Sequence, residues 1–215
     1  MIRRTHSLVL FVLLLFTLSG CGAMFDPGPP PAVYALSPSF ASSMAGQHNG
    51  KSSLQLSVAM PAADEMLAGN RIITRYPDGE LRVWKNAGWV SSLPAMLQQQ
   101  LIAGYEKAAL FTVLPSDASG FNADYSLLTD IRHFSVIMDQ AGNPASVQVQ
   151  ITAHVMDLRS GRSLGYLNSD KLVELAPDKN LKTALAAFDQ AAGQAISEIC
   201  TWSSGIVLSR QTKRP

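Results

Sequence analysis

The sequence contains few charged residues, only two cysteines and no apolar run long enough to cross a membrane. Charged residues make up 15% of the 215 residues, below the roughly 25% usual for soluble domains. Seventeen Lys and Arg balance 16 Asp and Glu, which argues against a nucleic-acid binder, because such a protein needs a basic surface. Cys21 and Cys200 alone cannot build a disulfide framework. The 47% of hydrophobic residues is ample for a core, so we expect one globular domain with distinct ends.

The first 21 residues have the features of a bacterial lipoprotein signal peptide. Two arginines precede Leu8–Leu18, an uncharged apolar run of 11 residues that is shorter than the roughly 20 residues of a membrane span. The next residues, Leu18-Ser19-Gly20-Cys21, are similar to a lipobox, with cleavage between Gly20 and Cys21. A buried N-terminal helix with a chance cysteine would not explain this order of features. We therefore predict a signal peptide over residues 1–20 and lipidation of Cys21.

The residues after Cys21 predict where the lipidated chain is held. In Gram-negative lipoproteins generally, Asp after the lipidated cysteine is associated with the inner membrane. Gly22 occupies this position here, so we expect the outer membrane, on its periplasmic face. Residues 21–32 read as a tether, because Pro29-Pro30-Pro31 favours the extended polyproline conformation. A single domain is expected over residues 33–205, followed by a basic tail over 206–215, and the Ser/Gly-rich residues 37–53 are expected to form a mobile loop.

Turn residues and period-two patterning predict the strands. Pro77-Asp78-Gly79 lies between two β-rich segments and predicts a hairpin, and Asn86–Gly88 predicts a second turn before Trp89. Gly142-Asn143-Pro144 and Arg159–Gly161 separate three long segments, which we expect to form an antiparallel meander. The expected strands cover residues 54–60, 71–76, 80–84, 112–114, 125–138, 145–158 and 162–175.

Two longer segments follow the 3.6-residue period of amphipathic helices. The first begins at Ser92-Leu93-Pro94 and is expected to reach about Ala109, with Gln98–Gln100 on its exposed side. The second begins at Asp178 or Asn180 and is expected to continue to about Trp202, with Gly205 ending it. The fold class is therefore predicted as α+β, with a mostly antiparallel sheet and two amphipathic helices packed on one face.

A search for chemistry yields few candidates. No HExxH, CxxC, GxSxG, P-loop or GxGxxG pattern occurs, so we predict no catalytic residues, no metal site and no cofactor. His133 and His154 are expected roughly diagonal on neighbouring strands, but a zinc site would need a third ligand. Cys200 is expected to be a small buried residue on a helix. Trp84 and Trp89 bracket a short turn and could contact lipid or a partner, although the interpretation we favour is that both cap the edge of the core.

The order of the apolar motifs resembles one known family. The lipobox and tether lead to Tyr34-Ala35-Leu36, and the remaining motifs follow in a fixed order: Leu56-Ser57-Val58, Leu67–Arg75, Glu80–Trp84, Leu93-Pro94, Phe111–Val113, Ala123–Tyr125 and Asp157–Gly161. Over roughly residues 33–200 the chain is similar to the ABC-type transport auxiliary lipoproteins, which include the paraquat-inducible lipoprotein. The Ser-rich loop and the basic tail have no counterpart in this resemblance.

The resemblance implies a non-enzymatic role in lipid traffic or envelope integrity. The implied partners are the membrane, a mammalian-cell-entry (MCE) domain protein and an ABC permease complex, and the charge balance argues against nucleic acid. Separately, an apolar pocket between helix and sheet could carry phospholipid directly. The solvent-exposed face of the sheet, or its edge strands, would supply the contacts with these partners. Two alternatives stay open: an assembly or chaperone lipoprotein for an outer-membrane β-barrel, and a periplasmic hydrolase.

Overall fold

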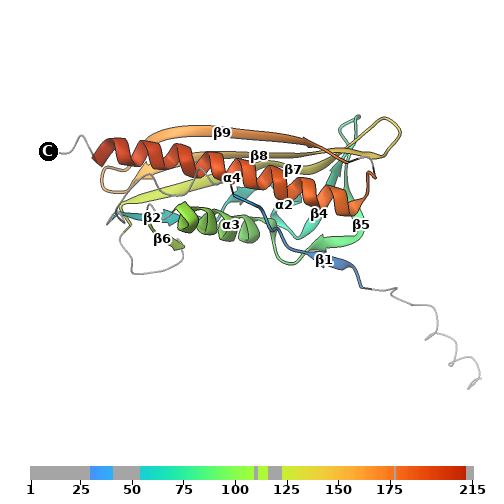
Figure 1. Cartoon of the computed structure of the whole chain (residues 1–215), viewed down its shortest axis with the longest axis horizontal. Coiled ribbons are helices and arrows are strands. Elements are labelled where there is room, and N and C mark those ends of the chain that lie inside the picture. The colour runs from blue at the N-terminus through green and yellow to red at the C-terminus, as the bar shows by residue number, and fades with distance from the viewer. Residues whose placement is uncertain (1–29, 41–53, 109–110, 116–122, 177, 212–215) are drawn as a thin grey trace, which may run out of the picture. The chain divides into compact units, whose positions relative to one another are not determined.

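The computed structural model describes residues 30–40, 54–108, 111–115, 123–176 and 178–211 (Figure 1). The predicted signal peptide, most of the tether, residues 41–53 and residues 212–215 lie outside this description. Ala32–Pro215 form one compact unit, and its mixed sheet and helices confirm the α+β class. The helices are α2 (Glu65–Ala68), α3 (Leu93–Ala108) and α4 (Leu181–Gln211). The strands are β1 (Ala32–Tyr34), β2 (Gln55–Val58), β3 (Ala62–Ala63), β4 (Arg71–Arg75), β5 (Leu81–Trp89), β6 (Thr112–Pro115), β7 (Tyr125–Met138), β8 (Pro144–Asp157) and β9 (Arg162–Glu174).

The long strands form the antiparallel meander that the turn residues predicted. β7 pairs with β8 from Tyr125 opposite Asp157 to Met138 opposite Pro144. β8 pairs with β9 from Ser146 opposite Glu174 to Asp157 opposite Arg162. Gly142 and Gly161 adopt φ values of 78° and 67° in the two connecting turns, a conformation that glycine adopts without a steric penalty. The three strands therefore confirm the expected hairpins to within one residue at each end.

The other edge of β7 carries three short parallel strands. β2, β3 and β4 follow one another along this edge, with Leu56 opposite Tyr125, Ala62 opposite Asp130 and Ile73 opposite Ser135. β6 extends the sheet beyond β2, while β5 and β1 extend it beyond β4. The sheet is consequently mixed, and its parallel pairs come from crossover connections that no local turn signal reveals.

β5 is longer than expected because Asn86–Gly88 does not form a turn. The strand continues to Trp89, and its pairing with β4 shifts register between Arg71 and Ile73. Asn86 has a φ of 55°, a left-handed conformation that Asn tolerates better than most residues. The predicted turn is therefore a bulge inside a strand, where the extra residue bends the chain without reversing it.

Helices α3 and α4 cover one face of the sheet, as expected (Figure 1). The inward residues of β8, from Val147 to Val155, are fully buried beneath them. An aromatic cluster lies at the centre of the core: the ring of Trp89 meets Phe134 and Phe188 edge-on at 5.9 and 5.3 Å, and Phe134 stacks on Phe188 at 4.8 Å. Such pairs contribute about 0.5–1.5 kcal/mol beyond their buried area.

Two expectations about the helices are wrong. Gln98 is 4% exposed, because its side-chain amide donates to the carbonyl of Val58 at 3.0 Å, so this polar residue joins α3 to β2. Gly205 does not end α4, which continues to Gln211 and includes residues assigned to the tail. Beyond Gly205, Val207 is 1% exposed, and its burial outweighs the cost of about 1 kcal/mol that glycine brings to a helix interior.

The segment after β1 is fastened to both long helices. The expectation of a mobile loop is therefore wrong for residues 37–40, and residues 41–53 lie outside the described residues. Leu36 is 4% exposed within the core, and its carbonyl accepts a hydrogen bond from Gln100 of α3 at 3.2 Å. On α4, the backbone oxygen of Ser39 would lie 2.5 Å from a Cβ atom built on Gly193. The chain can therefore cross α4 this closely only because residue 193 has no side chain.

We predict opposite effects for the same substitution at two glycines of α4. Gly193→Ala forces the added methyl group into Ser39, so we expect the free energy of unfolding to fall by about 1–3 kcal/mol. Gly205→Ala meets no atom within 4 Å and should raise it by up to about 1 kcal/mol through helix propensity. Urea unfolding of both variants checks the prediction. Equal effects of the two substitutions would contradict the close crossing at Gly193.

Candidate functional site

The residues singled out from the sequence fall into different environments. Gly20 and Cys21, the predicted cleavage and lipidation residues, lie outside the described residues. Trp89 is 1% exposed in the aromatic cluster, so the idea of an exposed tryptophan pair is wrong for this residue. Trp84 is half-buried and packs against the core. Trp89 is therefore a structural residue that a surface partner cannot reach.

The two strand histidines share a face but lie apart. His133 pairs with Gln150 and His154 pairs with Leu128, so His154 lies four positions along β8 from the partner of His133. The expected roughly diagonal placement is therefore wrong, although the two histidines do share a face. The Nδ1 atom of His133 accepts a hydrogen bond from Arg75, whereas the ring of His154 lies 4.9 Å from that of Tyr166. No group of three His, Cys, Asp or Glu residues that could hold a metal ion occurs in the described part of the chain.

Cys200 is buried in α4, as predicted, and is 1% exposed. Burial raises the pKa of its thiol, although a hydrogen bond with Tyr105 opposes the shift. The Tyr105 hydroxyl also lies 2.6 Å from Ser203 Oγ, and its own pKa is raised well above the usual value, chiefly by burial. A protonated, enclosed thiol is a poor nucleophile. The contacts among Tyr105, Cys200 and Ser203 instead join α3 to α4.

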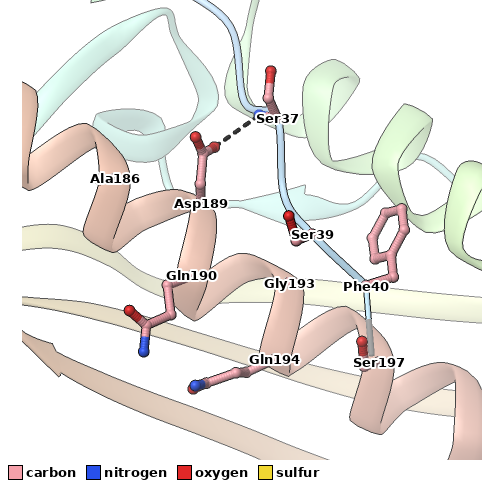
Figure 2. Close-up of a pocket in the computed structure, with 9 residues that line it drawn as sticks. All are labelled: Ser37, Ser39, Phe40, Ala186, Asp189, Gln190, Gly193, Gln194 and Ser197. Carbon is pink, nitrogen blue, oxygen red and sulfur yellow. Dashed lines mark hydrogen bonds between the residues drawn. The ribbon is translucent and has the colours of Figure 1, made fainter. Parts of the chain in front are cut away.

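A groove with a volume of about 760 Å³ lies between the segment at residues 37–40 and α4 (Figure 2). A neighbouring hollow of about 690 Å³ near Tyr34 shares Ala186 and Asp189 with it. The segment is held across the groove at two points: Asp189 accepts the backbone N–H of Ser37 at 2.7 Å, and Lys107 of α3 donates to the carbonyl of Phe40 at 3.2 Å. We name this surface the α4 groove, lined by Ser37, Ser39, Phe40, Ala186, Asp189, Gln190, Gly193, Gln194 and Ser197.

Asp189 is the acidic group of the α4 groove. Burial raises the pKa of its carboxyl, and the hydrogen bond from Ser37 partly opposes this shift. Gln190 and Gln194 are exposed and point away from the segment in Figure 2. Asp189 thus both lines the groove and holds the chain's own segment at residues 37–40. We interpret the groove as the place where the segment that follows the tether is fixed to the domain.

The opposite face of the meander presents a row of exposed side chains. Leu128 of β7, His154 of β8 and Tyr166 of β9 are direct cross-strand neighbours. Leu128 and Tyr166 are 43% and 55% exposed, and Leu172 of β9 is 61% exposed on the same face. We name Leu128, His154 and Tyr166 the β-face row. Large apolar side chains gathered in the open are typical of contact surfaces.

Sequence reasoning missed this row and the Arg75–His133 contact. The outward positions of β8 are mostly polar, including Gln148 and Gln150. The sequence therefore predicts a polar, solvent-exposed face and gives no sign of the apolar side chains on it. Only the cross-strand register shows that Leu128 and Tyr166 flank His154, because they lie 38 residues apart in the sequence. Asp189 was missed because its place in the periodic pattern of the helix does not show that Ser37, far away in the sequence, approaches it.

The raised pKa of Asp189 predicts a pH-dependent difference between wild type and Asp189→Asn. The folded state binds the Asp189 proton more tightly than the unfolded state, so wild type loses stability as pH rises from the ordinary pKa of 3.8 through the raised one. Asparagine keeps an acceptor for Ser37 and has no such loss. In urea unfolding between about pH 3 and about pH 7, the free energy of unfolding of the variant should rise relative to that of wild type as pH rises.

Asp178→Asn, at an exposed position before α4, provides the control for this comparison. We expect no comparable gain for it over the same pH range. A stability difference for Asp189→Asn that stays constant, or that moves in favour of wild type as pH rises, would contradict the burial of the carboxyl.

Comparison with known structures places the fold. A crystal structure of a Xanthomonas campestris protein superposes with a TM-score of 0.73 at 22% identity, covering 85% of this chain and all of that one. A second crystal structure, of an uncharacterized protein, gives a TM-score of 0.59 at 17% identity over 81% of this chain and 99% of that one. At these identities the likeness concerns the fold alone. Within the described part of the chain, no helix has the length and apolar character needed to span a membrane.

Comparison of sequences identifies the family. An uncharacterized protein of Bradyrhizobium diazoefficiens is 27% identical over 154 residues, which are 70% of this chain and 40% of the relative, so this chain spans less than half of that protein's length. Residues 34–200 match the ABC-type transport auxiliary lipoprotein component family, over the range where the motifs resembled it. Membership in a lipoprotein family also supports a location in the cell envelope. Because this match extends over most of the chain, the protein belongs to the ABC-type transport auxiliary lipoproteins.

Proposed function

We propose that this protein is a non-enzymatic docking component of an MCE-type ABC system for lipid transport between membranes. In this proposal Cys21 anchors it in the outer membrane on the periplasmic side, where it helps to maintain the envelope. The observation that carries the proposal is the family match over residues 34–200, preceded in the sequence by a lipobox that ends at Cys21. The partners are an MCE-domain protein and its ABC permease complex.

The anchor part of the proposal rests on the chemistry of Cys21. Each buried methylene of an acyl chain contributes about 0.8 kcal/mol, and more than one chain makes residence in the membrane stable. The tether after Cys21 contains three consecutive prolines and extends by roughly 3.1 Å per residue where it is polyproline-like. The chain then enters the domain at β1 and the segment that Gly193 and Asp189 hold, so the anchored end is continuous with a firmly packed part.

The docking part of the proposal assigns the partner to the β-face row. The row lies on the face away from α3 and α4, and its apolar side chains are substantially exposed. β9 forms an end of the sheet path, since it pairs only with β8 among the described strands. A free strand edge beside exposed apolar residues suits a partner that adds a strand or packs on the face.

The absence of a reaction is part of the proposal. Both strand histidines already have partners, an arginine for His133 and a tyrosine ring for His154. Cys200 is enclosed and its pKa is raised, which does not suit a nucleophile. These features support a structural role over the hydrolase alternative.

The anchor predicts where variants of the two cysteines are found. Cys21→Ser should move the protein from the membrane fraction to the soluble fraction, because serine cannot carry the lipid that the cysteine thiol receives. Cys200→Ala is the matched control and should stay with the membrane. The measurement is the distribution between membrane pellet and supernatant. Membrane retention of Cys21→Ser would contradict the anchor.

The docking surface predicts the effect of a charge on partner capture. Tyr166→Glu places a carboxylate in the β-face row and should lower recovery of the MCE-domain protein in affinity purification by about tenfold, equivalent to about 1.4 kcal/mol. Gln190→Glu adds the same charge on the exposed side of α4 and should leave recovery unchanged. Equal recovery with both variants would contradict the assigned surface. Recovery of a β-barrel protein in place of the MCE-domain protein would support the chaperone alternative instead.

A further inference from the structure

A small cavity on the other side of the sheet from the α4 groove has an unusual lining. It encloses about 210 Å³ between α2, β4 and β7. Its aliphatic lining comes from Met66, Leu67, Ile73 and Leu81. Of these, Ile73 is 1% exposed although it does not belong to the main core cluster. Phe134 of β7, a residue of the core beneath α3 and α4, also lines the cavity, so this mostly apolar space borders that core through β7.

The hydroxyl group of Ser135 gives this cavity a polar atom without a protein partner. Ser135 is 2% exposed, lines the cavity, and its Oγ atom makes no hydrogen bond in the described structure. Its cross-strand neighbours are Ile73 on β4 and Gln148 on β8. Burying a hydroxyl group without a partner costs free energy. Such a group beside an open space is a natural contact for a bound molecule.

Arg75 supplies positive charge at the same place. One nitrogen of its guanidinium donates to Nδ1 of His133, and the other lies 3.5 Å from the side-chain oxygen of Gln148. No carboxylate among the described residues forms an ion pair with Arg75. The nearby carboxylate of Asp170 accepts a hydrogen bond from the side chain of Gln148 instead. A half-buried cation without an acidic partner favours an anion nearby.

His133 completes the set of hydrogen-bond donors. Because its Nδ1 accepts from Arg75, the neutral ring carries its proton on Nε2. Burial and the charge of Arg75 lower the pKa of His133, while Asp170 opposes this, so the neutral form is favoured. The lining also includes Arg132, which pairs with Asp130 at 2.8 Å, and the exposed carboxylate of Asp64. The remaining cationic group is thus Arg75.

We propose that this cavity binds the head-proximal part of an anionic lipid. The phosphate or carboxylate would lie against Arg75, His133 and Ser135, and the first carbons of the chain against Met66, Leu67 and Leu81. The volume is below the roughly 300–1,000 Å³ of a pocket that encloses a whole small molecule, so the remainder of the lipid extends outside. The choice of a lipid over another amphipathic anion rests on the proposed function.

The test uses hexyl phosphate as a soluble probe of this chemistry, measured by titration calorimetry on the Cys21→Ser full chain. We expect saturable binding of hexyl phosphate, with inorganic phosphate and hexanol each at least about tenfold weaker, because the site needs both head and tail. Dihexanoyl phosphatidate should compete with hexyl phosphate for the site. Equal binding of inorganic phosphate would overturn the amphipathic site. Failure of the phosphatidate to compete would overturn the assignment to lipid.

Variants locate the binding in the cavity. Arg75→Gln should weaken hexyl phosphate binding by at least about tenfold, whereas Arg82→Gln, which removes an exposed arginine on the adjoining strand, should leave it unchanged. Ser135→Ala should also weaken binding without loss of thermal stability, because it removes a hydroxyl group that has no partner. This second variant decides the matter if Arg75→Gln does not fold. Wild-type binding by Arg75→Gln, or by Ser135→Ala in its place, would overturn the site.

Partner capture separates this inference from the proposed function. If hexyl phosphate does not bind but the MCE-domain protein is still recovered, the lipid site is wrong and the docking role stands. If hexyl phosphate binds and dihexanoyl phosphatidate competes with it but no MCE-domain protein is recovered, the proposed docking function fails and the site for an anionic lipid stands.

Discussion

The structure depends on the pairing of β7 along both of its edges. β8 follows it on one side, while β2, β3 and β4 share the other side in sequence. Its inward residues, Leu127, Ile131, Phe134 and Val136, are at most 1% exposed, so the strand is both the centre of the sheet and the base on which α3 and α4 pack. A strand fixed on both edges and covered on one face leaves only its other face available to partners.

This division of the sheet organises the functional surfaces. On the helix side of the sheet lie the buried aromatic cluster and, at the surface, the segment that leads in from β1 and crosses α4. Gln100, Asp189 and the close approach to Gly193 hold this segment. On the other face lie the β-face row and the Arg75–His133–Ser135 cavity, which are both built on outward positions of β7 and its neighbours. β7 thus carries the core on its inward face and parts of both the proposed docking surface and the proposed lipid site on its outward face.

Much of the fold could be predicted from local signals in the sequence. Period-two patterning and turn glycines located the meander, and 3.6-residue periodicity located α3 and the start of α4. The errors arose where a distant contact overrides a local preference: Val207 extends α4 through Gly205, and Val58 draws Gln98 into the interior. The parallel strand pairs were not predicted because they also depend on distant contacts: Leu56 and Tyr125, for example, lie far apart in the chain. Local patterning says nothing about such contacts.

The functional surfaces were harder to predict because they are assembled across strands. Leu128 and Tyr166 flank His154 only because of the register of β8 with its two neighbours. Arg75 of β4 contacts His133 of β7, which lies 58 residues further along the chain. Site-specific photo-crosslinking in intact cells tests the central claim of a docking role most directly. A crosslinker at position 166 should capture an MCE-domain protein, while one at position 182 on α4 should not. Capture of that partner from position 182 alone, or of no envelope protein from position 166, would contradict the account.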